Sequence, residues 1–247
     1  MPMRLSRRRR WILAAIPLAA TALPAAFVGS RLGTDNFATV VPSGVYRASQ
    51  MRADALDRAL KQHRIKTVLN LRGEHLDQPW YRDERDTTLR DGATQVDIAL
   101  SSSEWMSRAQ ARALVAVLDR GERPILIHCL HGSERTGVVT AFSELLRPGG
   151  SIATARAQFS WRYLFFGVGN GARMPRHLDR YEAWLASRSR THTPDLFRRW
   201  VREIYIPERP SREYWAHDAV PPVVVTKPDG TRLARGFDTT DETPAPR

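Results

Sequence analysis

The sequence predicts an α/β protein with a central, mostly parallel sheet of four to five strands flanked by helices. Short apolar runs of strand length alternate along the chain with longer segments of helical periodicity. The chain has 247 residues and 42% hydrophobic content, which is enough for one substantial core. Because parallel strands need crossover connections, this alternation indicates a sheet covered by helices on both faces.

The elements follow in order from residue 52. Helical spacing of apolar residues, with Gly92 as a C-terminal cap, predicts helices over residues 52–64, 81–91, 105–119, 136–146, 152–163, 175–187 and 194–205. Short apolar or alternating runs predict strands over residues 65–71, 94–100 and 124–128. Four aromatic residues beyond these strands are expected to pack in the core: Trp161, Tyr163, Phe165 and Phe166.

Both ends of the chain are expected to lie outside the core. Residues 1–10 contain five arginines and no acid, and residues 11–29 are apolar apart from Thr21, so residues 1–30 have the layout of a signal peptide or an N-terminal membrane anchor. The basic flank is expected to stay in the cytoplasm while the folded domain, residues 31–206, is exported. Prolines, charges and turn signals predict an extended or disordered tail over residues 207–247.

The segment from Ile125 to Gly137 carries the predicted chemistry. Cys129, the only cysteine, ends the apolar run, and Arg135 follows six residues later at the start of a helix. A loop of this length can turn its backbone N–H groups around an anion, and the helix adds the positive end of its dipole. Gly132 permits a sharp turn, and the Arg135 guanidinium matches two phosphate oxygens. The pattern therefore predicts a phosphate cradle around a cysteine with a lowered pKa.

The residues of the predicted cradle have distinct roles. Thr136 is expected to donate its hydroxyl to the thiolate, and His128 to fix the loop through its ring. A purely structural cysteine is the competing interpretation, and the joint order of strand, His-Cys pair, glycine, Arg-Thr-Gly and amphipathic helix disfavours it. Six consecutive residues are predicted to bind phosphate: Leu130, His131, Gly132, Ser133, Glu134 and Arg135.

The signature from His128 to Gly137 resembles that of the cysteine-dependent protein tyrosine and dual-specificity phosphatases, particularly their compact bacterial members. Weaker similarities to the same family occur in residues 44–50, 68–74, 157–163 and 178–181. The resemblance implies the cysteine-phosphatase fold and a reaction in two steps, in which Cys129 takes the phosphoryl group and water then hydrolyses the phosphocysteine.

The resemblance also requires a general acid, and here the sequence departs from the commonest pattern. Many relatives carry an aspartate in the loop after the strand that precedes the signature, but residues 101–104 contain none. Glu134 ranks first, because it resembles the position of an aspartate in myotubularin-like phosphatases; its competing interpretation is a solvent-facing loop residue. Asp97 lies in a predicted strand, where a structural carboxylate is the competing interpretation. Glu104 has a capping box with Ser101 as its competing interpretation.

A protein tyrosine or dual-specificity phosphatase is therefore the expected enzyme. The alternatives are a phosphatase for inositol phosphates, a catalytically weak phospho-binding module, and a sulfurtransferase, which would not need the Arg-Thr-Gly helix start. The absence of lysine from the loop favours a phosphoprotein substrate. The net charge is +12, of which about +7 lies outside residues 1–30, and it is spread through helices of mixed charge. This favours phosphorylated partners and argues against nucleic acid.

The single cysteine also fits an oxidising compartment, because no internal disulfide can trap Cys129. With the bacterial resemblance, the domain is expected in the periplasm, or anchored to the inner membrane through the N-terminal segment. No cofactor is expected. No metal is expected either, because the strand and loop do not present His128 and His131 with Cys129 as a tetrahedral set.

Overall fold

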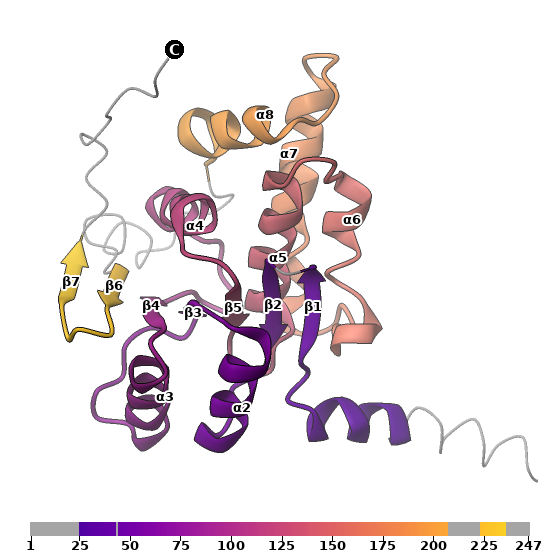
Figure 1. The fold of residues 1–247 in the computed structure, drawn as a ribbon. Coiled ribbons are helices and arrows are strands. Elements are labelled where there is room, and N and C mark those ends of the chain that lie inside the picture. The colour runs from indigo at the N-terminus through magenta and orange to yellow at the C-terminus, as the bar shows by residue number, and fades with distance from the viewer. Residues whose placement is uncertain (1–24, 43, 207–222, 236–247) are drawn as a thin grey trace, which may run out of the picture.

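The computed structural model describes residues 25–42, 44–206 and 223–235. These residues form an α/β fold around a seven-stranded sheet with the order β1-β2-β5-β3-β4-β6-β7 (Figure 1). Four neighbouring strands in the middle of this sheet are mutually parallel, which confirms the predicted fold class. They are β2 (Val45–Ala48), β5 (Ile125–His128), β3 (Thr67–Asn70) and β4 (Thr94–Ile98).

Three antiparallel strands extend the sheet beyond the expected four to five. At one edge β1 (Ala38–Val41) pairs with β2; at the other β6 (Val223–Thr226) pairs with β4, and β7 (Arg232–Arg235) pairs with β6. The structure thus corrects the predicted C-terminal tail for residues 223–235. Three consecutive valines and a threonine favour a strand because β-branched side chains pack well on a pleated surface. The other residues of the predicted tail lie outside the described ranges.

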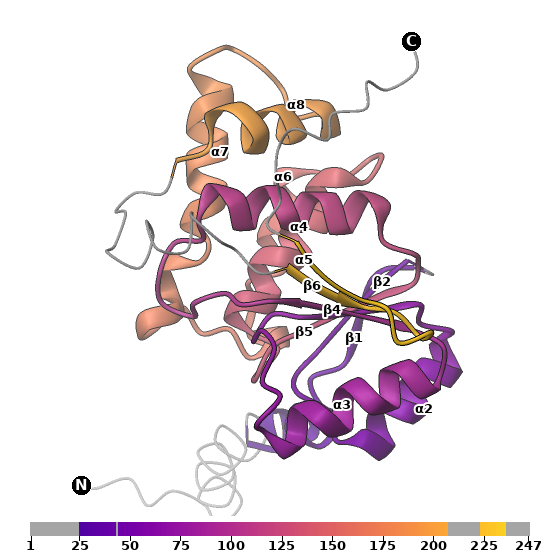
Figure 2. The same cartoon turned by 90° about the vertical axis from the view of Figure 1, so that its left-hand side faces the viewer.

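Helices cover both faces of the sheet (Figure 2). On one face lie α2 (Ala53–His63) and α3 (Pro79–Arg90). The other face carries five helices, α4 (Arg108–Arg120), α5 (Glu134–Leu146), α6 (Ile152–Arg156), α7 (Arg176–Ala186) and α8 (Pro194–Arg199). Short helical turns are η1 (Trp161–Tyr163), η2 (Asn170–Arg173) and η3 (Trp200–Ile204).

The predicted helices occur in the predicted order, with two differences that matter for the site. α4 begins at Arg108 and not at residue 105, because Ser107 and Gln110 form a capping box there. The segment predicted as one helix over residues 152–163 ends its α-helix at residue 156 and resumes only as the η1 turn.

The aromatic residues in and after η1 are only partly in the core. Tyr163 is buried as expected, whereas Trp161 is 64% exposed and Phe166 is 61% exposed. The core prediction is therefore wrong for these two residues. For Trp161 the reason is that the helix predicted to run to residue 163 is broken after residue 156.

Side chains alternate across β5, so its two faces meet different layers. Ile127 and Cys129 belong to the larger apolar cluster, which includes α4 and α5. Leu126 belongs to the smaller cluster beneath α2. His128 therefore faces the α2 and α3 layer, while Cys129 faces α5.

Among the helices of the described ranges, none combines the length and the hydrophobicity that a transmembrane segment needs. The signal peptide or membrane anchor predicted for residues 1–30 falls mainly on residues 1–24, which lie outside those ranges. Residues 25–30, the described part of this segment, belong to a helix over residues 25–33.

Candidate active site

The signature loop lies at the C-terminal edge of the parallel strands. β5 ends at His128, which stands beside Ala48 of β2 and Asn70 of β3, and Cys129 follows directly. α5 begins at Glu134, so the predicted order of strand, loop and helix is present. This edge is where open α/β sheets bind their ligands, since loops and helix N-termini converge there.

Cys129 is 1% exposed and is surrounded by groups that favour its thiolate. Burial alone would raise the pKa of the thiol, but the Arg135 guanidinium, the Thr136 hydroxyl and the backbone N–H groups of Thr136 and Gly132 lower it below the ordinary value. The donors come from the loop and from the first turn of α5. The same arrangement that holds an anion therefore keeps sulfur nucleophilic.

Arg135 closes the loop against the neighbouring strands. Its Nη1 donates to the carbonyl of Leu71, at 3.4 Å, and to that of Leu100, at 3.3 Å. These carbonyls lie just beyond the ends of β3 and β4. They fix the guanidinium beside Cys129, where its planar N–H groups match two oxygens of a phosphate.

Gly132 forms the sharp turn of the loop. Its φ is +66°, and a Cβ atom at this position would lie 2.5 Å from the carbonyl oxygen of Ala48. The Gly132 carbonyl points outward, where it accepts hydrogen bonds from Arg47 Nη2 at 2.8 Å and from Asn36 Nδ2 at 3.3 Å. Turning the carbonyl outward leaves the N–H groups of the loop on the side of the sulfur.

Sequence reasoning missed Arg47 and Asn36 as parts of the site. Arg47 is fully buried, its Nη1 donates to the backbone and side-chain oxygens of Gln158 at 3.0 Å, and its guanidinium stacks 3.8 Å from the Tyr163 ring centre. Burial lowers the pKa of Arg47, although Tyr163 and the Cys129 sulfur act to raise it. An arginine inside the apolar run of β2 is a signal that could have identified it; Asn36 has no such signal.

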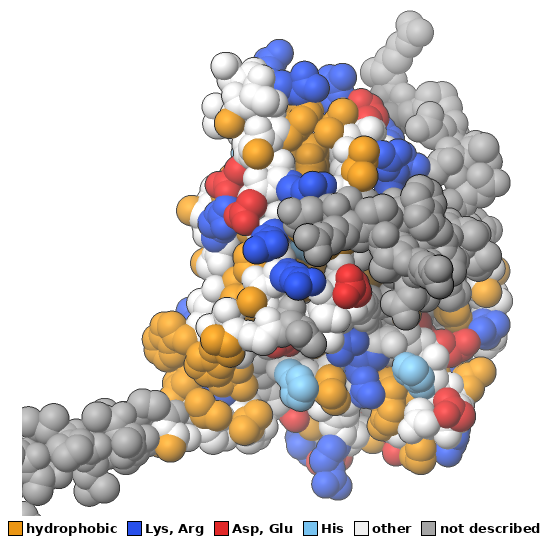
Figure 3. All heavy atoms as spheres, turned by 180° about the vertical axis from the view of Figure 1, so that it is seen from behind, with side chains coloured by type: hydrophobic (Ala, Val, Ile, Leu, Met, Phe, Trp, Pro, Cys, Tyr) orange, Lys and Arg blue, Asp and Glu red, His pale blue; other side chains and the backbone are white. Residues whose placement is uncertain are grey.

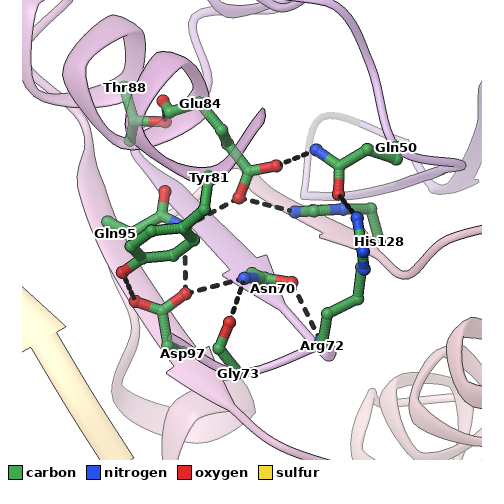
Figure 4. Close-up of polar contacts among 10 residues, drawn as sticks. All are labelled: Gln50, Asn70, Arg72, Gly73, Tyr81, Glu84, Thr88, Gln95, Asp97 and His128. Carbon is green, nitrogen blue, oxygen red and sulfur yellow. Dashed lines mark hydrogen bonds and ion pairs between the residues drawn. The ribbon is translucent and has the colours of Figure 1, made fainter. Parts of the chain in front are cut away.

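A buried polar network lies beneath the loop on the α3 side (Figure 4). His128 Nε2 forms an ion pair with Glu84 Oε1 at 3.2 Å, and Glu84 also accepts from Gln50 and from Gln95 Nε2, the latter at 2.9 Å. Burial alone would lower the pKa of His128, but Glu84 raises it above the ordinary value. Burial alone would raise the pKa of Glu84, but His128 lowers it. The ring of His128 therefore contacts α3, whereas the sequence predicted that it would fix the loop.

Asp97 belongs to the same network and is 1% exposed. Tyr81 donates to its Oδ2 at 2.6 Å, and Asn70 donates to its Oδ1 at 2.8 Å. Burial raises the pKa of Asp97 to about 6, against the hydrogen bonds from Tyr81 and Asn70. A pKa in this range suits a general acid, yet one oxygen is bonded to α3 and the other to β3 and β4. The geometry therefore supports the structural interpretation of Asp97.

The two glutamates occupy different places around the loop. Glu134 is the first residue of α5 and is partly exposed, and its side chain packs on η2, where a Cβ at Gly171 would meet its Cγ at 2.1 Å. The Glu104 N–H donates to Ser101 Oγ at 3.0 Å, but no helix begins there. The competing interpretation of Glu104 as part of a helix cap is therefore wrong.

The remaining residues of the loop face away from the sulfur. Ser133 Oγ donates to the carbonyl of Leu164 at 3.1 Å, and Leu130 is 43% exposed while its carbonyl accepts from the Gln50 N–H at 3.2 Å. His131 is exposed. The Ser133 side chain therefore holds the loop in place, and the exposed side chains of Leu130 and His131 form its rim.

The α/β fold, with a loop closed by Arg135 around Cys129, is the arrangement that the resemblance to the cysteine-dependent phosphatases implied. Residues 41–149 match the Tc-R-P family model, described as "Polymorphic toxin system, DSP-PTPase phosphatase". The match covers this part of the chain alone, and it agrees with the cysteine-dependent phosphatase that the signature predicted. A search of curated proteins finds no match.

Several solved structures are similar to this chain. The catalytic domain of the PP-IP phosphatase SIW14 from S. cerevisiae is 20% identical with a TM-score of 0.47, over 62% of this chain and 93% of that one. TpbA from P. aeruginosa is 19% identical with a TM-score of 0.47, over 62% and 92% of the two chains. A putative phosphatase from Shewanella putrefaciens is 16% identical with a TM-score of 0.46, over 62% and 97%. At these values the similarity adds no functional information of its own.

Proposed function

We propose that this phosphatase hydrolyses phosphotyrosine, with or without phosphoserine and phosphothreonine, in proteins outside the cytoplasm. The observation that carries the proposal is the buried Cys129, whose pKa is lowered by Arg135 and by donors from the loop and α5. A cradle of this kind binds a dianionic phosphate and presents sulfur to it from one side.

The reaction follows from this geometry in two steps. The Cys129 thiolate attacks phosphorus while the bond to the ester oxygen breaks, and that oxygen leaves with its electron pair and takes a proton from the general acid. Water then attacks the phosphocysteine, releasing inorganic phosphate and restoring the thiolate. Arg135 and the loop N–H groups neutralise the phosphoryl oxygens in both steps.

We assign the general acid to Glu134, with Glu104 as the second candidate. Glu134 directly precedes Arg135 at the start of α5 and is partly exposed. Glu104 takes no part in the helix cap and lies in the loop whose Leu100 carbonyl contacts Arg135. Asp97 is disfavoured because its oxygens are bonded to α3, β3 and β4.

Substrates whose leaving groups differ in pKa distinguish the candidates for the general acid. Glu134→Gln is expected to lower kcat/KM for phenyl phosphate by about 10²-fold or more, and to affect p-nitrophenyl phosphate far less, because p-nitrophenolate leaves without protonation. The pH–rate profile should also lose its alkaline limb. Asp97→Asn and Glu104→Gln are the matched variants. If Glu104→Gln shows this selective loss instead, the assignment to Glu134 is wrong.

The experiment on the proposed activity uses the full-length protein, purified in detergent, with p-nitrophenyl phosphate. Wild type should turn over and Cys129→Ser should be inactive while remaining folded by circular dichroism. A folded, inactive wild type that binds tungstate would indicate a phospho-binding module, and activity with thiosulfate and cyanide would indicate a sulfurtransferase. Phosphotyrosine and phosphoserine peptides, compared with inositol phosphates, then identify the substrate class.

The exported location is part of the proposal. The basic and apolar residues 1–30 support it, together with exposed hydrophobic side chains on the domain (Figure 3). Leu32 is 63% exposed on the helix over residues 25–33, and the ring centre of Phe27 in the same helix lies 4.8 Å from that of the exposed Trp161. A reporter enzyme that is active only outside the cytoplasm can be fused to the C-terminus of the full-length protein. Reporter activity is the expected result, and an inactive reporter would contradict export.

A further inference from the structure

Arg72 stands beside the phosphate cradle without belonging to the signature. It follows Leu71, whose N–H donates to the His128 carbonyl at 2.9 Å and whose own carbonyl accepts from Arg135 at 3.4 Å. In the parallel register Asn70 is opposite His128, so Leu71 and Arg72 continue alongside the first residues of the loop. The topology therefore brings a second arginine to the edge of the sheet where Cys129 lies.

The Arg72 guanidinium is fixed by two contacts. It stacks on Trp80 of α3, with Cζ 3.5 Å from the ring centre, and its Nη1 donates to Gln50 Oε1 at 2.9 Å (Figure 4). Gln50 in turn donates from its backbone to the Leu130 carbonyl and from its side chain to Glu84. Stacking and hydrogen bonding reduce the entropy that a flexible arginine would lose on binding a ligand.

The charge of Arg72 has no direct counter-ion within the described residues. Glu84, the acid that acts on its pKa, is itself paired with His128, and the ion pairs among the described residues do not include Arg72. Burial and the charge of Arg135 lower the pKa of Arg72, while Glu84 and the Cys129 sulfur raise it. Two arginines near one another repel, and an anion bound at both would offset this cost.

We propose that Arg72 binds a second anionic group of the substrate, next to the phosphate that Arg135 and the loop hold. The inference rests on the proposed function, which places the scissile phosphate on Cys129. The loop N–H groups and Arg135 already match one phosphate, and Arg72 approaches from the β3–α3 side on its own aromatic support. The preferred substrate is then a phosphate ester with a carboxylate or a second phosphate a few bonds away.

Two small anions test the subsite directly. Methylphosphonate offers one anionic group and methylenediphosphonate offers two, and neither is hydrolysed. Isothermal titration of the full-length protein should show methylenediphosphonate binding at least about tenfold more tightly, which is the effect expected of one charge-assisted contact. Arg72→Gln should lose most of this preference and change methylphosphonate binding by less than about threefold.

The matched control is Arg90→Gln, which makes the same change of charge on an exposed part of α3, where Arg90 pairs with Asp57 at 3.1 Å. It should behave as wild type. Arg72→Lys keeps the charge but loses the planar stacking, and should retain only part of the preference; it also serves if Arg72→Gln does not fold.

Three outcomes overturn the inference. The first is an equal loss of affinity for methylphosphonate and methylenediphosphonate in Arg72→Gln. The second is an unchanged affinity for both ligands in that variant, and the third is a wild type that binds the two ligands equally well. Turnover of p-nitrophenyl phosphate separates this inference from the proposed function. Turnover without a preference for the double anion overturns the subsite alone, whereas an Arg72-dependent preference without turnover supports the subsite and contradicts the phosphatase activity.

Discussion

At the scale of single residues, Gly132 determines the shape of the phosphate cradle. Its positive φ suits glycine, and the carbonyl of Ala48 occupies the space that any side chain would need. Arg47 and Asn36 then hold its carbonyl outward. One backbone conformation therefore links the parallel strands to the direction of the N–H groups around Cys129.

Replacement of Gly132 by alanine should both destabilise the domain and distort the cradle. We expect Gly132→Ala to lower the free energy of unfolding by about 1–3 kcal/mol, and kcat/KM for p-nitrophenyl phosphate by about 10²-fold or more. Urea unfolding and steady-state kinetics measure the two effects. Gly92→Ala is the matched control, because Gly92 has a φ of +74° but a Cβ added there would meet no atom within 4 Å. Equal losses in the two variants would show that crowding at Gly132 is unimportant.

At the scale of elements, the hairpin of β6 and β7 braces the edge of the sheet nearest the loop that carries Arg72. Val223 and Val224 are buried against the domain. From β7, Arg232 pairs with Glu74, its Nη2 lying 2.6 Å from Oε2. Glu74 is two residues beyond Arg72, so the hairpin restrains the β3–α3 connection that positions the proposed second anion site.

The contribution of the hairpin can be measured with two truncations of side chains. Val223 is 2% exposed and packs in the larger core, so Val223→Ala should cost about 1–3 kcal/mol of unfolding free energy. Leu233 of β7 is 37% exposed, and Leu233→Ala should cost less than about 1 kcal/mol. Urea unfolding of both variants provides the comparison. If Val223→Ala has no larger effect than Leu233→Ala, the hairpin does not form part of the cooperative core.

At the scale of the whole molecule, the buried network beneath the loop joins α3 to β3, β4 and β5. The His128–Glu84 ion pair lies at its centre, with both side chains almost fully buried. The pKa of His128 is raised and that of Glu84 is lowered. The pair therefore stabilises the fold between these two values, and its contribution is lost as pH falls through the lowered pKa of Glu84 or rises through the raised pKa of His128.

This linkage predicts an alkaline loss of stability. The unfolding free energy of wild type should decline as pH rises above about 6.5, the ordinary pKa of histidine, and should level off once pH passes the pKa of His128 in the folded protein. The reason is that His128 loses its proton at a lower pH in the unfolded chain than in the folded one. Glu84→Gln should remove this decline and cost about 3–5 kcal/mol near neutral pH, since it leaves a buried group without its partner. Asp97, with a pKa of about 6, is already largely ionised throughout this pH range, so its titration does not cause the decline. Parallel pH profiles of the two proteins would contradict the prediction.

The sequence by itself determined the α/β class, the strand–loop–helix order around Cys129 and the arginine that closes the loop, because these depend on periodicity and on residues close together in the chain. Glu84, Arg47 and the hairpin at residues 223–235 act across long separations, and only the tertiary structure brought them to the site. The register of the parallel strands determines which other residues lie beside the loop. It placed Asn70 and His128 side by side, buried Asp97 beneath α3, and carried Arg72 to the edge of the cradle. Such contacts depend on which strands become neighbours, and local sequence patterns do not specify that order.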